Sequence, residues 1–173
     1  MLQNGDVFPS VTFARAGGGD IHLPGDLAGG FGVILIYRGS WSRACNDQLY
    51  AFSRAADKFA EEGIKVVSVS VDDRETIETL VDSHKLAFPV AYAADAWAVS
   101  AVTGAFVNED AAFLEATGFV INPEGRIETA IYTNGEGSED RIVTVSYSAR
   151  AVGRLMPGDV LGVVRRLKSS ARN

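Results

Sequence analysis

Cys45 is the only cysteine in this chain of 173 residues, and it lies in the segment YRGSWSRACNDQL, Tyr37 to Leu49. A thiol acts as a nucleophile only when it is deprotonated. The unpaired N–H groups and the dipole at a helix N-terminus favour that thiolate, and Arg38 and Arg43 add positive charge nearby. A second interpretation is structural, because free cysteine is among the most buried residue types and is often inert.

The elements around Cys45 favour a functional position. Val33 to Tyr37 is an unbroken, β-branched apolar run, which predicts a buried strand. A helix is predicted from Arg43 to Glu62, ending at Gly63. Its apolar positions follow steps of three and four and include the cysteine itself: Cys45, Leu49, Phe52, Ala56 and Phe59. In open α/β sheets, ligands collect beyond the carboxyl ends of the strands, which is where Cys45 lies.

The rest of the chain continues the alternation of strands and helices. Further strands are predicted at Val11–Ala14, Ile21–Leu23, Ile64–Val71, Phe88–Ala93, Thr117–Ile121, Ile127–Thr133 and Ile142–Ser148. Asp72 and Asp73 are expected to cap a second helix, Asp95 a third, and Pro157 to begin the last. This order predicts an α/β fold with a central mixed β-sheet flanked by helices on both faces. Residues 1–173 are expected to form one domain.

Composition excludes several classes of function. The net charge is −6 and the sequence pI is about 4.9, which disfavours nucleic acid and anionic membrane surfaces as partners. One cysteine cannot form an internal disulfide, and with two histidines it is a poor source of metal ligands. An unpaired thiol fits a reducing compartment, and no apolar run is long enough to span a membrane. We therefore expect a cytoplasmic protein without a metal.

Several stretches, taken in order, resemble one family. NGDVFP, YRGSW, ACNDQL, SVSVDD, FPVAYAADA, AVTGAF, TGFVINPEGRI and AVGRL follow one another over most of the chain. Their order is similar to that in the peroxiredoxin-like branch of the alkyl hydroperoxide reductase and thiol-specific antioxidant (AhpC/TSA) family. This resemblance implies a thioredoxin-like fold.

The resemblance also implies roles for Ser42 and Cys45. That branch usually carries Cys-x-x-Cys, and here Ser42 replaces the first cysteine. Peroxiredoxins carry Thr-x-x-Cys, in which the second position is the peroxidatic cysteine and the hydroxyl donates to the thiolate and the peroxide. The implied function is a one-cysteine thiol peroxidase that reduces hydroperoxides through a sulfenic acid at Cys45. An external thiol would reduce that acid, with no organic cofactor or metal.

This sequence departs from the peroxiredoxin pattern at two places. Arg38 replaces the proline of the active-site stretch, and Glu115-Ala116-Thr117 stands where an arginine is expected before the strand Phe119–Ile121. Arg38, Arg43 or Arg154 would have to supply that charge, although we favour a structural or surface role for Arg154. Trp41 and Arg43 are candidate substrate-binding residues, and the resemblance to thioredoxin-like folds adds Thr117. Packing under the loop is the alternative for Trp41, and a solvated position in the first helical turn is the alternative for Arg43.

Two alternatives to a peroxidase stay open. The first is a thioredoxin-fold protein that has lost catalysis and serves as a binding or redox-sensing module. The second treats Ser42 as an engineered replacement that traps an intermediate. The resemblance further implies a homodimer.

Overall fold

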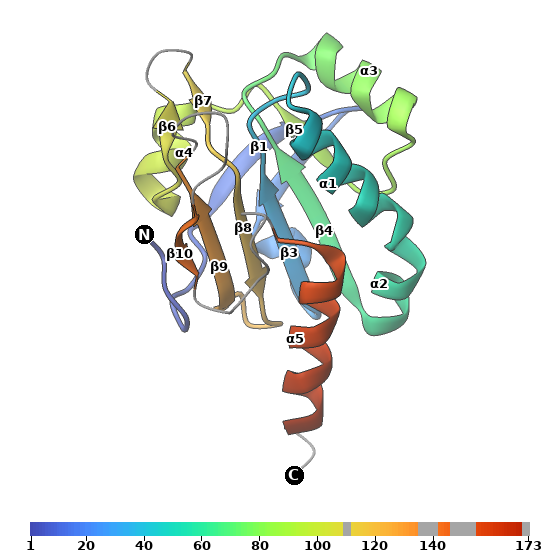
Figure 1. Ribbon diagram of the computed structural model, residues 1–173, viewed down its shortest axis with the longest axis vertical. Helices are drawn as coiled ribbons and strands as arrows, with labels where there is room; N and C mark the ends of the chain where they lie inside the picture. The colour runs from blue at the N-terminus through green and yellow to red at the C-terminus, as the bar shows by residue number, and fades with distance from the viewer. Residues whose placement is uncertain (109–111, 135–141, 146–154, 171–173) are drawn as a thin grey trace.

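The computed structural model describes residues 1–108, 112–134, 142–145 and 155–170 (Figure 1). The strands are β1 (Val11–Arg15), β2 (Asp20–Leu23), β3 (Phe31–Ile36), β4 (Ile64–Val69), β5 (Val90–Tyr92), β6 (Val107–Asn108), β7 (Phe113–Leu114), β8 (Thr117–Ile121), β9 (Ile127–Thr133) and β10 (Ile142–Val145). The helices are the short 3-10 helix η1 (Gly25–Leu27), α1 (Arg43–Arg54), α2 (Ala56–Glu62), α3 (Arg74–His84), α4 (Ala96–Thr103) and α5 (Pro157–Ser170).

One sheet of eight strands, in the order β10-β9-β8-β3-β4-β5-β1-β2, forms the centre of the molecule. β3 pairs in parallel with β4, with Val33 opposite Val66, and β4 pairs in parallel with β5. On its other side β3 pairs antiparallel with β8, with Ile34 opposite Phe119. The sheet is therefore mixed, and β3 lies in its middle.

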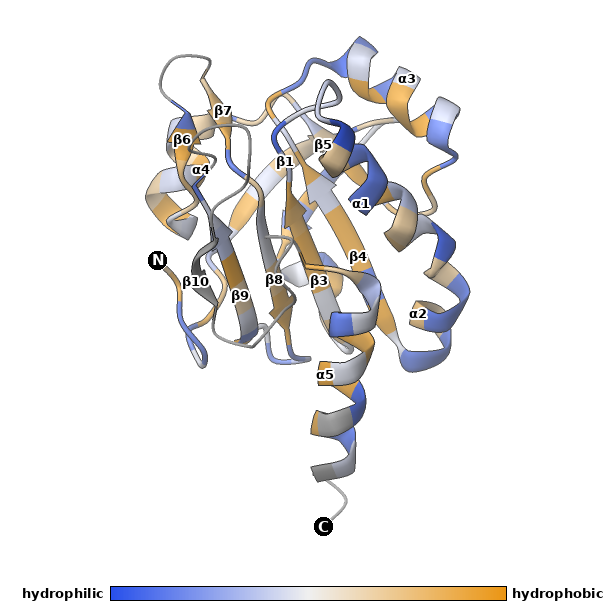
Figure 2. Ribbon diagram, viewed as in Figure 1, coloured by the Kyte–Doolittle hydropathy of each residue, from blue (hydrophilic) through white to orange (hydrophobic). Residues whose placement is uncertain are grey.

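Alternation along β3 divides the core into two layers. Ile34 and Ile36 pack on one face with residues of β8, β9 and α4. Val33, Leu35 and Tyr37 pack on the other face against α1, α2, α3 and α5. Figure 1 shows α1, α2 and α5 across one face of the sheet, and Figure 2 shows apolar residues concentrated on the strands between the layers. The predicted α/β class, with a mixed sheet and helices on both faces, is confirmed.

The long helix predicted from Arg43 to Glu62 is two helices. Ala55 leaves helical geometry, with φ −88° and ψ 2°, between α1 and α2. The rings of Phe52, before the break, and Phe59, after it, lie 5.5 Å apart and fill the same core cluster. The predicted end at Gly63 is confirmed, since Gly63 adopts a left-handed conformation there, with φ 68°.

The remaining boundaries differ in smaller ways. Asp73 caps α3 by accepting from the Thr76 N–H at 2.9 Å, whereas Asp72 binds elsewhere. Asp95 caps α4 as predicted. β5 is shorter than the predicted run, and β10 ends at Val145, beyond which Ser148 lies outside the described residues. The β6–β7 pair was not predicted, because two residues a strand are too few to show a period.

Candidate functional site around Cys45

The loop from β3 to α1 folds tightly over itself at Gly39. Its φ of 157° places it at the limit of the region that favours glycine. A Cβ on Gly39 would lie 2.4 Å from the indole nitrogen of Trp41, so any larger residue would displace that ring. The Ser42 N–H donates to the Gly39 carbonyl at 3.1 Å, which closes the turn just before the helix.

Polar contacts from two elements hold this loop in place. The Ser40 N–H donates to the Asp72 carboxylate at 2.7 Å, from the chain that follows β4. The Asn46 side-chain amide donates to the Ser40 carbonyl at 2.8 Å, from the first turns of α1. The loop that delivers Ser42 and Cys45 is thus tied to the neighbouring parallel strand and to its own helix.

Ser42 and Cys45 are brought together at the start of α1. Ser42 is the N-cap, with extended φ and ψ of −84° and 109°, and its Oγ accepts from the Cys45 N–H at 3.4 Å. This contact uses a lone pair of the hydroxyl oxygen and leaves its hydrogen available to donate. The predicted placement of Cys45 in the first turn of a helix is confirmed.

Cys45 is fully buried, with 0% of its surface exposed, on the core face of α1. It belongs to the cluster that contains Tyr37, Leu49, Val120 and Leu155. Leu155 covers this part of the sheet so closely that a Cβ on Gly118 would lie 2.9 Å from the Leu155 Cβ.

Gln48 fixes that cover to α1. Its side-chain amide donates to the Leu155 carbonyl at 2.7 Å, and both residues are buried. Because the sulfur is fully buried, a reagent in solution reaches it only after the structure around it has opened.

Tyr37 is a buried polar neighbour of Cys45. From the sequence it is recognisable only as the end of the apolar run that begins at Val33. Its side chain is 0% exposed and packs in the same cluster as the cysteine. Burial raises the pKa of Tyr37 well above its ordinary value, the Ser70 hydroxyl lowers it in part, and negative charge on Asp72 and Cys45 raises it further. Tyr37 consequently stays neutral at physiological pH and keeps a proton to donate. The sequence does carry a signal for this burial. Tyr37 follows Leu35 by two residues, and side chains two apart along a strand lie on the same face.

Arg38 and Glu115 form an ion pair at the end of β3. The Arg38 Nε lies 3.2 Å from Glu115 Oε2, and Glu115 is only 4% exposed. The antiparallel register, with Ile36 opposite Thr117, places these two residues across from each other. The Arg38 guanidinium lies 4.8 Å from the Trp41 ring centroid and 5.2 Å from that of Phe113, so it also makes cation–π contacts. In the sequence, Arg38 and Glu115 stand as two separate departures from the family pattern. The structure shows that they pair with each other.

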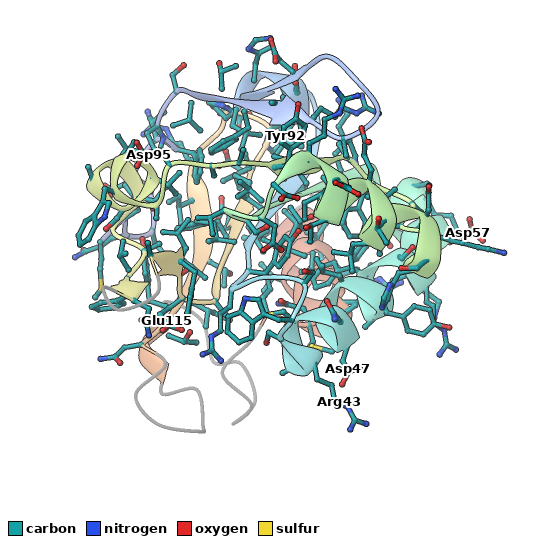
Figure 3. All side chains as sticks on the ribbon, turned by 90° about the horizontal axis from the view of Figure 1, so that it is seen from above. Arg43, Asp47, Asp57, Tyr92, Asp95 and Glu115 are labelled. Carbon is teal, nitrogen blue, oxygen red and sulfur yellow. The ribbon has the colours of Figure 1, made fainter. Side chains whose placement is uncertain are left out.

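The proposed substrate-binding residues occupy three different environments. Trp41 is 57% exposed and packs edge-on against Phe113, with ring centroids 5.0 Å apart. The Arg43 side chain is 95% exposed, 4.0 Å from Asp47, and Figure 3 shows both at the rim of the molecule. Thr117 is buried and donates to the Glu115 carbonyl at 3.1 Å. Arg154 lies outside the described residues. A substrate-binding role for Trp41, Arg43 or Thr117 remains a prediction.

The described ranges also bear on metal binding and on membrane insertion. These ranges hold no group of three or more His, Cys, Asp or Glu side chains arranged to bind a metal ion. They also hold no helix with the length and apolar character needed to cross a membrane.

Comparison with known proteins gives relatives of two kinds. A thiol-disulfide oxidoreductase, ResA from Bacillus cereus, is 29% identical over 91 residues, which span 52% of this chain and 51% of that protein. A peroxiredoxin from Treponema denticola is 22% identical over 175 residues, which span 98% of this chain and 75% of that protein.

The solved structures confirm the predicted thioredoxin-like fold. The crystal structure of peroxidoxin BcpB from Mycobacterium tuberculosis superimposes with a TM-score of 0.75 at 18% identity, covering 96% of this chain and 99% of that one. The sequence model of the AhpC/TSA family matches residues 4–130, which is well over half of the chain. This chain therefore belongs to the AhpC/TSA family.

Proposed function

We propose that this protein is a one-cysteine thiol peroxidase whose nucleophile is Cys45. The observation that carries the proposal is the arrangement at the start of α1. A hydroxyl three residues before the sulfur caps the helix, directly after the central parallel strand. Family membership supports a thiol peroxidase-like role, and the retained Ser-x-x-Cys favours peroxide chemistry over dithiol exchange.

The chemistry begins with attack of the Cys45 thiolate on one oxygen of a hydroperoxide. A sulfur–oxygen bond forms and the oxygen–oxygen bond breaks, so that the sulfur is oxidised and the alkoxide or hydroxide leaves and takes a proton. The product at Cys45 is a sulfenic acid. One external thiol then forms a mixed disulfide and releases water, and a second returns Cys45 to the thiol and leaves as a disulfide.

Two hydroxyl groups near the sulfur support this chemistry. The Ser42 hydrogen is available to donate to the sulfur or to the departing oxygen. The neutral Tyr37 hydroxyl lies close enough to Cys45 for negative charge on the sulfur to raise the pKa of Tyr37. Because both hydroxyl groups are buried, a donated hydrogen bond would stabilise negative charge more there than in water.

Full burial of Cys45 adds an opening step to this proposal. The segment at Leu155 and the first turn of α1 would separate before peroxide enters. At high peroxide concentration the rate of oxidation should therefore level off at the rate of opening.

The first test is to mix fully reduced protein with a small excess of hydrogen peroxide and follow its intact mass. We expect addition of one oxygen within seconds, far faster than for the same protein unfolded in urea, and reversal by an added thiol. Cys45→Ser is the blank. Oxidation no faster than in the unfolded protein would reject the peroxidase proposal.

Burial of the sulfur specifically favours a second candidate, a non-catalytic binding or redox-sensing module. Alkylation by iodoacetamide separates the two. A peroxidase should be alkylated in the folded state at the opening rate, whereas complete protection until the chain unfolds favours the module. The homodimer implied by the family resemblance remains a prediction, to be measured by light scattering.

A further inference from the structure

A cavity of about 580 Å³ lies beside the first half of β4, at the opposite end of that strand from the Cys45 loop. It occupies the place where β5 would continue if the sheet were complete. β5 pairs with β4 only at Ser68 and Val69. The first four residues of β4, Ile64 to Val67, line the cavity instead. We call this the β4 cavity.

Pro89 explains why the ladder stops there. The Ser68 N–H donates to the Pro89 carbonyl at 3.1 Å, so the even-numbered residues of β4 direct their main-chain groups toward β5. The next pair in a parallel ladder would need an N–H at position 89 to donate to the Val66 carbonyl, and proline has none. In the described part of the chain, the Val66 N–H and C=O have no strand partner on this side.

The walls of the β4 cavity are apolar. Phe52 and Phe59, from the helical layer, and Phe88, from the chain before β5, line it together with side chains from the opposite core layer. A volume of this size falls in the range that binds small ligands, and aromatic walls favour a large apolar group.

The cavity also has charged groups of both signs. The Lys65 ammonium donates to the Asp26 main-chain carbonyl at 3.2 Å, and the Asp26 carboxylate accepts from the main-chain N–H of His22 at 2.7 Å. Arg15 and Asp20 line the same cavity, and their side chains make no ion pair with the described residues. They lie near each other, because Ala14 pairs with Asp20 in the β1–β2 hairpin. Two positive and two negative side chains leave the lining neutral overall.

We propose that the β4 cavity binds a free α-amino acid with a large apolar or aromatic side chain. The ligand carboxylate accepts from the Arg15 guanidinium and the Val66 N–H, and its ammonium donates to Asp20 and the Val66 carbonyl. Its side chain packs among the three phenylalanines. A zwitterion matches a neutral lining that offers, within the described residues, one cation and one anion without an ion pair and one main-chain N–H and C=O without a strand partner.

The test is a ligand series on the whole protein, followed by NMR titration of the main-chain amides. L-phenylalanine is compared with phenethylamine, which lacks the carboxylate, and with 3-phenylpropionate, which lacks the amine. We expect saturable binding of phenylalanine, about tenfold weaker binding of each analogue, and a shift of the Val66 amide signal. The Val102 amide, in α4 and outside the cavity lining, serves as the internal control. Equal affinity for an analogue, or an unmoved Val66 signal, would overturn the proposal.

Variants sharpen the assignment. Arg15→Gln should weaken phenylalanine binding about tenfold but leave phenethylamine unaffected. Arg54→Gln, which removes an exposed arginine of α1 outside the cavity lining, should change neither affinity. If both variants lose affinity equally, the Arg15 contact is wrong. Cys45→Ser should bind like the native chain, so that this test succeeds or fails separately from the peroxidase proposal.

Discussion

Tyr37 and Arg38 are consecutive residues at the end of β3, yet their surroundings differ completely. Tyr37 packs in the apolar cluster that contains Cys45, where burial keeps its hydroxyl neutral. Arg38 is fixed by Glu115 and by the rings of Trp41 and Phe113. Because successive side chains of a strand point to opposite faces, one strand end supplies both a thiol environment and an ion-pair environment.

This difference identifies the donors that accompany the sulfur. The family resemblance led us to expect an arginine near the thiolate, and Arg38 was one candidate. Its guanidinium is already engaged by a buried carboxylate. Ser42 and Tyr37 are the buried hydroxyl groups that we propose as donors to Cys45, and the following predictions test whether the two environments work separately.

Leu155→Ala should give the largest effect. Removing a buried leucine costs about 3 kcal/mol of unfolding free energy, because its neighbours collapse only in part. The same change removes a large side chain from the buried cluster that contains Cys45, so iodoacetamide should alkylate the folded protein faster. Urea unfolding and intact mass measure the two effects. Leu161→Ala, on the same helical layer but only half-buried, is the matched control and should leave the alkylation rate nearly unchanged.

Glu115→Ala tests the ion-pair environment. Loss of the carboxylate removes a buried ion-pair partner of Arg38, and we expect a loss of about 2 kcal/mol of unfolding free energy. The rate of Cys45 oxidation by peroxide should stay the same. If Arg38 and Glu115 are energetically coupled, the double variant Arg38→Met/Glu115→Ala should lose less unfolding free energy than the sum of the losses of the two single variants. A large fall in the oxidation rate would contradict the separation of the two environments.

Tyr37→Phe tests the thiol environment through pH. The pKa of Tyr37 is raised in the folded state, so its contribution to stability is complete below the unfolded pKa of 10.0 and is lost as pH rises beyond it. The native chain should therefore lose stability between neutral pH and about pH 11. Tyr37→Phe should lose less over that interval, as measured by urea unfolding at each pH. Tyr132, whose pKa is raised to about 12, contributes in the same direction, and Tyr132→Phe is the parallel comparison.

Ser42→Ala removes the helix cap and the proposed donor together. Loss of an N-cap hydroxyl should lower the unfolding free energy by about 1 kcal/mol. Peroxide oxidation of Cys45 should slow as well. Ser42→Thr keeps the hydroxyl and should restore both, which separates the hydroxyl from simple packing. A normal oxidation rate in Ser42→Ala would remove Ser42 from the proposed chemistry.

Arg43→Gln should have the smallest effect. Its side chain is 95% exposed and lies 4.0 Å from Asp47, a geometry in which ion pairs contribute little. Neither the urea midpoint nor the oxidation rate should change. A clearly slower rate would restore Arg43 as a substrate-binding residue and would show that α1 rearranges before peroxide binds.

Local sequence determined the elements and much of their order. The β-branched run of β3, Gly63 after α2, and Asp73 and Asp95 at helix starts each produce their effect within a few residues. The same is true of Ser42 and Cys45, because a cap and the first helical turn are local structures. This is why the fold class and the location of the thiol could be predicted.

Contacts between distant segments decided the rest. The pairing of Arg38 with Glu115 requires β3 to lie beside β8, and the buried cluster around Cys45 takes in Leu155, which packs on Gly118 of β8. The contact between the rings of Phe52 and Phe59 joins the two helices on either side of Ala55, and the β4 cavity depends on where β5 stops. Periodicity shows which face of an element is buried, but only the assembled sheet determines which side chains share that face.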